Sequence, residues 1–301
     1  MKRLLFHIYN IPVWLITLLP LNVLYLLSDF FFLIIYYIAG YRKNVVMTNL
    51  KNSFPEKSDD EIKTIARRFY RHLCDNFIES FYVLNMSVNE IKKRYRYKNI
   101  ELLNRVLNNK KSIILVAGHY ANWDWFASLP LYINQKAYAI YHPLSNKYFN
   151  ELFHRLRNKF GLGLIQMKTA YREMLAATRK HILTITLFMT DQRPIWSSSR
   201  YWTTFLHQET PVLIGSESIA KKLNQAVVYM DVQRIRRGYY DVEFKLLYEN
   251  PLQTEEYELT EAHTRMLEGI IIKKPEYWLW SHRRWKHNRK NIEKRLKKRN
   301  D

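Results

Sequence analysis

Short apolar runs alternate with helical patterns through the centre of this 301-residue chain. The runs are rich in β-branched and aromatic residues and cover 112–117, 137–142, 162–167, 182–189, 226–232 and 239–248. Helical patterns separate most of them, at 122–134, 146–159, 169–179 and 215–224. Such alternation is typical of a parallel sheet with helices on its faces, and the short link between the last two runs predicts an antiparallel hairpin. We therefore expect an α/β fold with a mostly parallel central sheet flanked by helices.

Residues 11–40 form a long apolar stretch in which Asp29 is the single charged residue. About 20 apolar residues suffice for a membrane-spanning helix, and the stretch is too long for a signal peptide. Basic residues flank both ends, so the charge pattern does not orient it. We expect an N-terminal hydrophobic membrane-anchor helix that either spans once or bends at Pro20 and lies in one leaflet. The alternative is an unusually apolar core helix.

The chain is strongly basic overall. Lys and Arg number 48 against 27 Asp and Glu, a formal net charge of +21. Such a field attracts nucleic acid, an anionic membrane or an acidic protein. The sequence predicts an anchoring segment at 1–43, an α/β domain at 44–282 and a basic tail at 283–301. The tail either is solvated or binds anionic lipid headgroups.

Two smaller patterns limit the chemistry. Cys74 is the single cysteine, which excludes an intramolecular disulfide and is compatible with a reducing compartment. Histidine spacings typical of a metal site are absent from the sequence, so we expect neither a metal nor another cofactor.

Ser58 and Glu61 have the spacing of a capping box and predict the start of a long helix.

The segment "GHYANWD", residues 118–124, carries the candidate chemistry. His119 follows its strand by two residues, and open α/β sheets bind ligands beyond the carboxyl ends of their strands. If a helix starts directly after the turn, Asp124 reaches the imidazole and orients it as a general base. Ser, Thr and Cys are absent from this turn, so the base would act on a substrate hydroxyl directly. The alternative is a buried histidine with a purely structural role.

Several blocks of the sequence resemble the bacterial lipid A late acyltransferases, within the lysophospholipid acyltransferase-like superfamily. "GHYANWD" is similar to their G-H-x-G-N-W-E block, and "RKNVVMTNLKNSFP", "AIYHPLSNKYFNELFHRLRNKFG", "LFMTDQRP" and "PEYWLWSHRRWK" resemble further blocks. The resemblance runs through nearly the whole chain. Ala121 replaces a glycine, Asp124 replaces a glutamate, and His142 stands where the second block has an arginine.

The resemblance implies roles for His119, Asp124 and Arg193. His119 would take the proton from an acceptor hydroxyl, and Asp124 would orient it. The hydroxyl oxygen would then attack an acyl thioester, and the tetrahedral oxyanion requires a hydrogen-bond donor. Arg193 is our candidate for contacting that oxyanion or an acceptor phosphate, against the alternative of an ordinary surface arginine.

Further residues are expected beside them. Asn122 is predicted to cap the helix after His119 and to line the substrate pocket. Asp191 and Gln192 are placed in the substrate-binding loop, with a role in organising it rather than in chemistry. Arg283 and Arg284 face either anionic headgroups or solvent.

The resemblance also implies partners and location. The acyl donor would be the acidic acyl carrier protein, with acyl-CoA as the alternative, and the acceptor an anionic glycolipid precursor of lipid A. This places the protein at the cytoplasmic face of a bacterial inner membrane. The same chemistry on another lipid, an amino-acid-linked lipid or a glycerol lipid, is a second hypothesis, motivated by His142. A nucleic-acid-binding protein is a third, but no binding motif in the sequence supports it.

Overall fold

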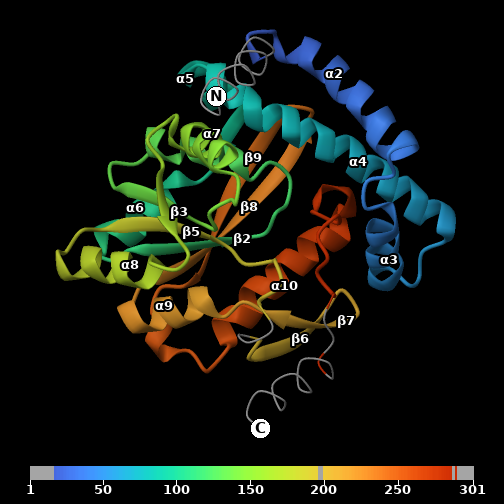
Figure 1. Cartoon of the computed structure of the whole chain (residues 1–301). Helices are drawn as coiled ribbons and strands as arrows, with labels where there is room; N and C mark the ends of the chain where they lie inside the picture. The colour runs from blue at the N-terminus through green and yellow to red at the C-terminus, as the bar shows by residue number, and fades with distance from the viewer. Residues whose placement is uncertain (1–16, 196–198, 287–288, 290–301) are drawn as a thin grey trace.

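The computed structural model describes residues 17–195, 199–286 and 289 (Figure 1). Its centre is a seven-stranded sheet in the order β1-β9-β8-β2-β5-β3-β4. The strands are β1 (Tyr95–Tyr97), β2 (Ile113–Ala117), β3 (Lys136–Tyr141), β4 (Gly163–Gln166), β5 (Thr184–Met189), β8 (Ala226–Arg236) and β9 (Tyr239–Tyr248). Neighbouring strands are parallel except for the antiparallel pair β8–β9. The predicted mostly parallel sheet and its terminal hairpin are confirmed.

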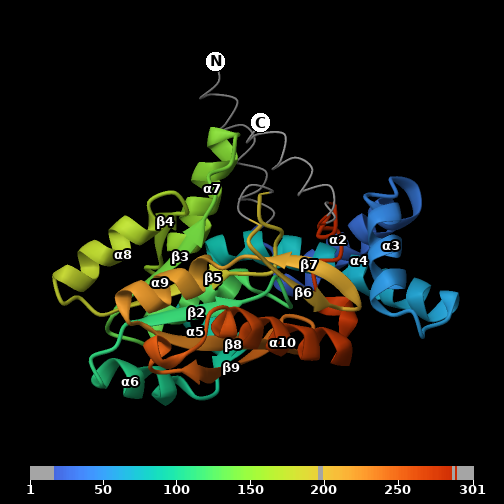
Figure 2. The same cartoon turned by 90° about the horizontal axis from the view of Figure 1, so that it is seen from below.

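Helices cover both faces of this sheet. In Figure 1, α4 (Asp59–Tyr82) and α5 (Val88–Arg94) lie above it, and α9 (Gly215–Leu223) and α10 (Glu258–Lys273) lie below it. Figure 2, seen from below, shows α9 and α10 across the near face. The remaining helices around the sheet are α6 (Ile100–Asn108), α7 (Lys147–Asn158) and α8 (Ala170–Arg179). The helices expected at 146–159, 169–179 and 215–224 are thus confirmed.

One predicted helix has a different form. The stretch expected to be helical over 122–134 is a 3-10 helix, η3 (Asp124–Leu131), with Pro130 inside it. Proline lacks an N–H group and clashes with the preceding turn, so a regular α-helix is disfavoured here. The residues between His119 and Asp124 are not helical, and Ala121 among them has a left-handed φ of 52°.

Other elements have weaker signals in the sequence. A second, antiparallel sheet consists of β6 (Tyr201–Phe205) and β7 (Gln208–Val212). Short 3-10 helices occur at η2 (Val83–Asn85), η5 (Pro251–Gln253) and η6 (Pro275–Tyr277). The capping box that starts α4 is confirmed, because Ser58 accepts from the backbone N–H of Glu61 and the Glu61 carboxylate accepts from that of Ser58.

The apolar N-terminal stretch forms α2 (Leu21–Leu33), which continues into the π-helix η1 (Ile34–Ile38). Helix α2 runs along α4 (Figure 1), and α3 (Lys43–Ser53) follows it. Leu21–Ile38 has a mean hydropathy of 1.9 and the length of a membrane-spanning helix. The first part of the predicted anchoring segment, residues 1–16, lies outside the described residues, as does most of the predicted basic tail.

The C-terminal segment packs into the body of the domain. Tyr120 forms an isolated bridge with Trp278, and the backbone N–H of Leu279 donates to the carbonyl of His119 at 3.1 Å. Arg284 is buried and donates to the carbonyl of Pro211, so the prediction that it faces headgroups or solvent is wrong. Burial of Trp278 removes a large aromatic surface from water, which stabilises this arrangement. The C-terminal segment therefore supports the loop that holds His119.

Candidate active site

His119 and Asp191 lie side by side because their strands are adjacent and parallel. The register of β2 and β5 pairs Ala117 with Met189. Two residues further along each strand stand His119 and Asp191, at the carboxyl edge of the sheet. Thr190 donates its backbone N–H to the carbonyl of Ala117 and extends the ladder to this point. Parallel pairing alone therefore brings the two side chains together.

The Asp191 carboxylate binds three donors. His119 Nδ1 lies 2.6 Å from Oδ1, and the backbone N–H of His119 donates to Oδ2 at 2.8 Å. The Trp278 indole N–H also donates to Oδ2, at 2.8 Å. Burial by itself would raise the pKa of Asp191, but the charge of His119 and these hydrogen bonds outweigh burial and lower it to about 2. The carboxylate is therefore ionised at neutral pH.

An ionised Asp191 determines the protonation of the imidazole. A carboxylate only accepts hydrogen bonds, so Nδ1 of His119 must carry a proton, and Nε2 of the neutral ring is free to accept one. The Gln192 amide nitrogen lies 3.3 Å from Nε2. The ring meets Trp123 edge to face, with centroids 5.1 Å apart, and the side chain is 16% exposed. Nε2 thus has the geometry of a general base.

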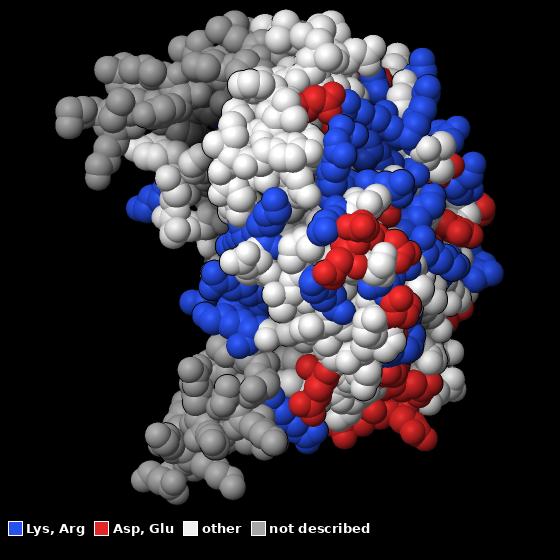
Figure 3. Space-filling model, turned by 90° about the vertical axis from the view of Figure 1, so that its right-hand side faces the viewer, with Lys and Arg blue, Asp and Glu red and all other residues white. Residues whose placement is uncertain are grey.

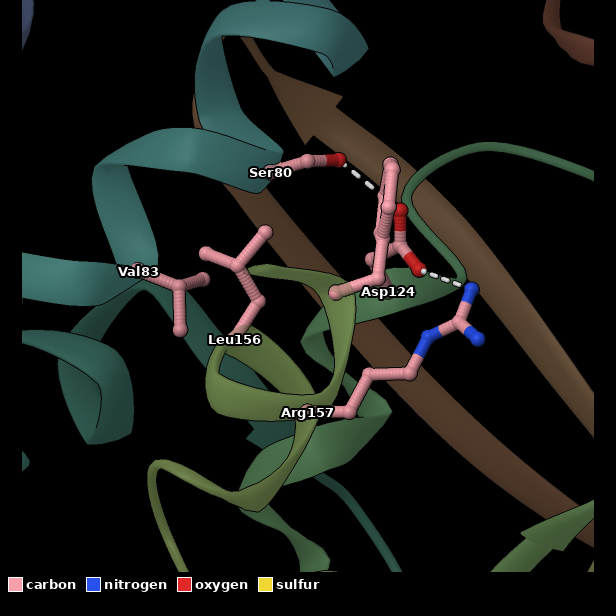
Figure 4. A pocket seen from close by; sticks show the side chains of 6 residues that line it. Ser80, Val83, Asp124, Leu156 and Arg157 are labelled. Carbon is pink, nitrogen blue, oxygen red and sulfur yellow. Dashed lines mark hydrogen bonds and ion pairs between the residues drawn. The ribbon is translucent and has the colours of Figure 1, made fainter. Parts of the chain in front are cut away.

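Asp124 has different partners (Figure 4). It accepts a hydrogen bond from Ser80 Oγ at 2.8 Å and forms an ion pair with Arg157 at 3.4 Å. This corrects the expectation that Asp124 orients His119. Its helix does not start at the turn: Ala121 adopts a left-handed conformation with φ of 52°, and the 3-10 helix begins only at Asp124 itself. The chain therefore carries Asp124 toward α4 and α7.

A hollow lies beside Asp124. It is shallow, with room for about one water molecule, and its walls are Ser80, Val83, Asp124, Phe153, Leu156 and Arg157. Figure 4 shows the Ser80 and Arg157 side chains converging on the carboxylate from different helices. The other walls are apolar. The ion pair thus marks the polar side of a small hydrophobic recess.

Asn122 is buried and fully engaged. Its side-chain amide donates to Glu79 Oε2 at 2.6 Å, and its oxygen accepts the backbone N–H of Trp125 at 3.1 Å. Asn122 thus accepts from an N–H of the first turn of η3, although Trp123, not Asn122, stands at the N-cap position. The side chain is 2% exposed, so it stabilises the loop after His119 and is not placed to contact substrate as expected.

Glu79 connects that loop to two other elements. Besides Asn122, Tyr25 of α2 and Tyr240 of β9 each donate to its carboxylate at 2.7 Å. Burial, together with the charge of Asp75, raises the pKa of Glu79. The sequence pattern does not single out this carboxylate, which lies 43 residues before Asn122 on a helix whose main signal is its apolar stripe.

Arg193, His282 and Arg284 each have a buried side-chain nitrogen without a hydrogen-bond partner in the described part of the chain. These atoms are Nη1 of Arg193, Nδ1 of His282, and both Nε and Nη1 of Arg284. Burial lowers the pKa of His282 to about 4, and the charges of Arg284, His119 and Arg193 contribute against the opposing effect of Asp191. Arg193 and Arg284 are thus two cations that act on the neutral His282, and the unpaired Nη1 of Arg193 is suited to contact an oxyanion or a phosphate.

Groups of three or more His, Cys, Asp or Glu side chains placed to bind a metal ion are absent from the described residues. The structure brings His119, Asp191 and Gln192 together and places Asp124 and Asn122 in neighbouring networks. The signal for the His119–Asp191 pair was available in the sequence. Each residue stands two positions after a predicted buried strand, and the carboxyl ends of parallel strands meet at one edge.

Comparison with known proteins gives two matches. Residues 1–287 match the family described as "Bacterial lipid A biosynthesis acyltransferase". A relative from Shigella flexneri, "Lipid A biosynthesis acyltransferase 2", is 24% identical over 132 residues. That alignment covers 44% of this chain and 42% of the relative, so it spans less than half of either protein.

Proposed function

We propose, from the premise that this chain belongs to the bacterial lipid A biosynthesis acyltransferase family, that it transfers a fatty acyl chain to a hydroxyl of a lipid A precursor. The protein is an acyltransferase by membership of this family, which is associated with bacterial membranes. The observation that supports the chemistry is the 2.6 Å contact between His119 Nδ1 and Asp191. It leaves Nε2 as the proton acceptor.

The proposed reaction needs one base and one oxyanion donor. Nε2 of His119 removes the proton from the acceptor hydroxyl as its oxygen forms a bond to the thioester carbonyl carbon. The carbonyl oxygen becomes an oxyanion. When the tetrahedral intermediate collapses, the carbon–sulfur bond breaks, and the thiolate takes the proton from the imidazolium. An ester and a free thiol result, and the enzyme returns to its starting protonation state.

Asp191 is a positioning residue in this scheme. Its two contacts to His119 fix the ring and the tautomer, and its negative charge stabilises the imidazolium that forms during the reaction. Arg193 supplies the donor for the oxyanion or for an acceptor phosphate, because its Nη1 has no partner among the described residues and Arg193, like His119, acts electrostatically on His282. Asp124 and Arg157 border the recess beside this site.

The proposed acyl donor is acyl carrier protein. The net charge of +21 attracts an acidic protein and raises its rate of association, an effect that salt weakens. Acyl-CoA is the alternative, since its phosphates are also anionic. Matched assays with acyl carrier protein and CoA thioesters of one chain length decide between them, at low and high ionic strength.

The proposed acceptor is an anionic glycolipid at the cytoplasmic face of the bacterial inner membrane. One observation favours a second acceptor class. His142 stands where the second sequence block of the resembling enzymes has an arginine. It is exposed, and its Nδ1 lies 3.0 Å from the carbonyl oxygen of Pro143. A permanent cation is thus replaced by a titratable group. Parallel assays with a lipid A precursor and with lysophospholipid or amino-acid-linked lipid acceptors distinguish the two.

The decisive experiment replaces the base. His119→Asn in the full-length protein should abolish acyl transfer while thermal unfolding stays close to that of the wild type. His181→Asn is the matched control, because His181 is exposed and asparagine accepts its left-handed conformation (φ of 53°). Retained activity in His119→Asn would refute the mechanism. Mass spectrometry of lipid A from cells with and without the gene then identifies the chain transferred.

A further inference from the structure

Helix α2 and the π-helix η1 expose an apolar stripe on the side away from the domain. Its members are spaced by three or four residues and are 44–70% exposed: Val23, Leu26, Phe30, Leu33 and Tyr37. The opposite side is buried against the domain at Leu21, Leu24, Tyr25, Ser28 and Phe32. The helix is therefore apolar on both sides, but only one side is covered by protein.

Polar contacts attach the middle of this helix to the domain. Tyr25 donates to buried Glu79 at 2.7 Å, and Ser28 donates to buried Asp75 at 2.7 Å. One residue later, Asp29 forms an ion pair with Arg237 at 2.8 Å. These contacts lie in the middle of the apolar stretch, and their partners belong to the catalytic domain.

A membrane-spanning orientation conflicts with these contacts. Leu21–Ile38 would measure about 27 Å as a helix, close to the thickness of the hydrocarbon core. Its middle would then lie at the centre of the bilayer, together with Glu79, Asp75 and Arg237. Charged groups are expensive at that depth and are rare there. The contacts are compatible with a helix that lies parallel to the membrane surface.

Two cations lie against aromatic rings of α2 and η1. Lys43 Nζ lies 4.3 Å from the ring centre of Tyr36, and the Arg71 guanidinium lies 5.0 Å from that of Phe32. Figure 3 shows an uncharged surface at the top of the molecule, on the side where α2 lies in Figure 1, with a broad band of Lys and Arg beside it. An apolar stripe with cations at its edge matches a leaflet of anionic lipid.

We propose that α2 and η1 form an in-plane membrane helix, whose outer stripe enters one leaflet while its inner side stays bound to α4. This deepens the proposed function, since it holds the active site beside a lipid acceptor, and its test does not depend on acyl transfer. The bilayer, rather than a second copy of this chain, is the occupant because the stripe continues an apolar sequence and cations border it.

Depth measurements test the orientation. Single cysteines at Val23, Phe30 and Tyr37, in a Cys74→Ala background, receive spin labels on the full-length protein in phosphatidylglycerol–phosphatidylethanolamine vesicles. An in-plane helix places all three labels at one shallow depth, about 5–10 Å below the headgroup boundary. A spanning helix instead separates the outer two labels by about 21 Å in depth. A label at Leu252, an exposed apolar residue of η5, should remain in water.

Vesicle binding provides the second readout. Leu26→Glu should weaken the affinity for these vesicles by about tenfold or more, since it places a charge where the proposed orientation inserts an apolar side chain into the leaflet. Leu252→Glu is the matched control and should bind as the wild type does, because both residues are more than 60% exposed. Graded depths across the three labels would overturn the proposal, as would labels shielded from lipid by a second copy. Loss of acyl transfer with unchanged label depths would count only against the proposed function.

Discussion

Replacing Asp191 by asparagine separates the pairing seen in the structure from the pairing expected from the motif. Asparagine keeps one oxygen, which can still accept from the backbone N–H of His119 and from Trp278, both of which contact Oδ2. The amide NH2 then faces Nδ1 of His119, where Oδ1 was 2.6 Å away. Two donors cannot face each other, so the ring must place its proton on Nε2. The base is lost although the shape is kept.

The size of the effect follows from the tautomer. The same carboxylate-to-amide change next to a catalytic histidine in serine proteases lowers kcat about 10⁴-fold, or roughly 5.5 kcal/mol of transition-state stabilisation. We expect a loss of that order in kcat for Asp191→Asn, with KM little changed because Asp191 is buried and does not reach substrate. Steady-state acyl transfer with purified protein, together with thermal unfolding, measures both.

Asp124→Asn is the matched comparison. It keeps an acceptor for Ser80 and loses an ion pair to Arg157 that is long, at 3.4 Å, and partly exposed. Such pairs contribute about 1 kcal/mol or less, so we expect a reduction in kcat of less than about tenfold. If Asp124→Asn were the more damaging change and Asp191→Asn retained most activity, the assignment of Asp191 as the orienting carboxylate would be wrong.

Three further predictions follow from the surroundings of the site. Gly118→Ala should destabilise the fold by about 1–3 kcal/mol in thermal unfolding and lower activity, because an added Cβ would lie 2.6 Å from buried Leu267. Ala121→Gly should raise the free energy of unfolding by about 0.5–1 kcal/mol, since it relieves a left-handed alanine; an unchanged or lower value in denaturant titrations would contradict this. Burial lowers the pKa of His263 to about 4. As the pH falls below about 6.5, His263 therefore binds a proton in the unfolded chain but stays neutral in the folded chain. Stability should therefore fall by up to about 3 kcal/mol per such histidine between pH 6.5 and 4, and His263→Gln should reduce that slope by one proton.

The fold was largely predictable because its signals are local. Each central strand is a short buried run, and β2 is buried along its whole length, from Ile113 to Ala117. Parallel strands need helical connections, and the sequence supplies them at the expected spacing. Strand β6 and helix α10 gave weaker patterns, because β6 buries only Phe205 and the buried stripe of α10 includes the polar residues Thr260 and His263. Periodicity reports burial on one side of an element and says little where burial is partial.

The position of His119 at the sheet edge was predictable, but the carboxylate that contacts it was not. His119 was identified from its place after a buried strand. The choice of Asp124 relied on proximity along the chain and on a helix starting at the turn. Pro130 and the left-handed Ala121 prevent that helix, and strand register supplies Asp191 from 72 residues away instead. Register between strands is a property of the assembled sheet, which one segment of sequence does not contain.

The three donors around Glu79 have a consequence for protein engineering. Membrane enzymes are often shortened at the N-terminus to make them soluble, and removing residues 1–40 here would delete Tyr25. Glu79, which is 0% exposed while α2 is in place, would lose one of its three side-chain donors together with the cover that Tyr25 provides. Only Asn122 and Tyr240 would then donate side-chain hydrogen bonds to the Glu79 carboxylate, both to Oε2. We therefore expect such a truncation to disturb the loop after His119 through Asn122, which donates to Glu79 and accepts from Trp125.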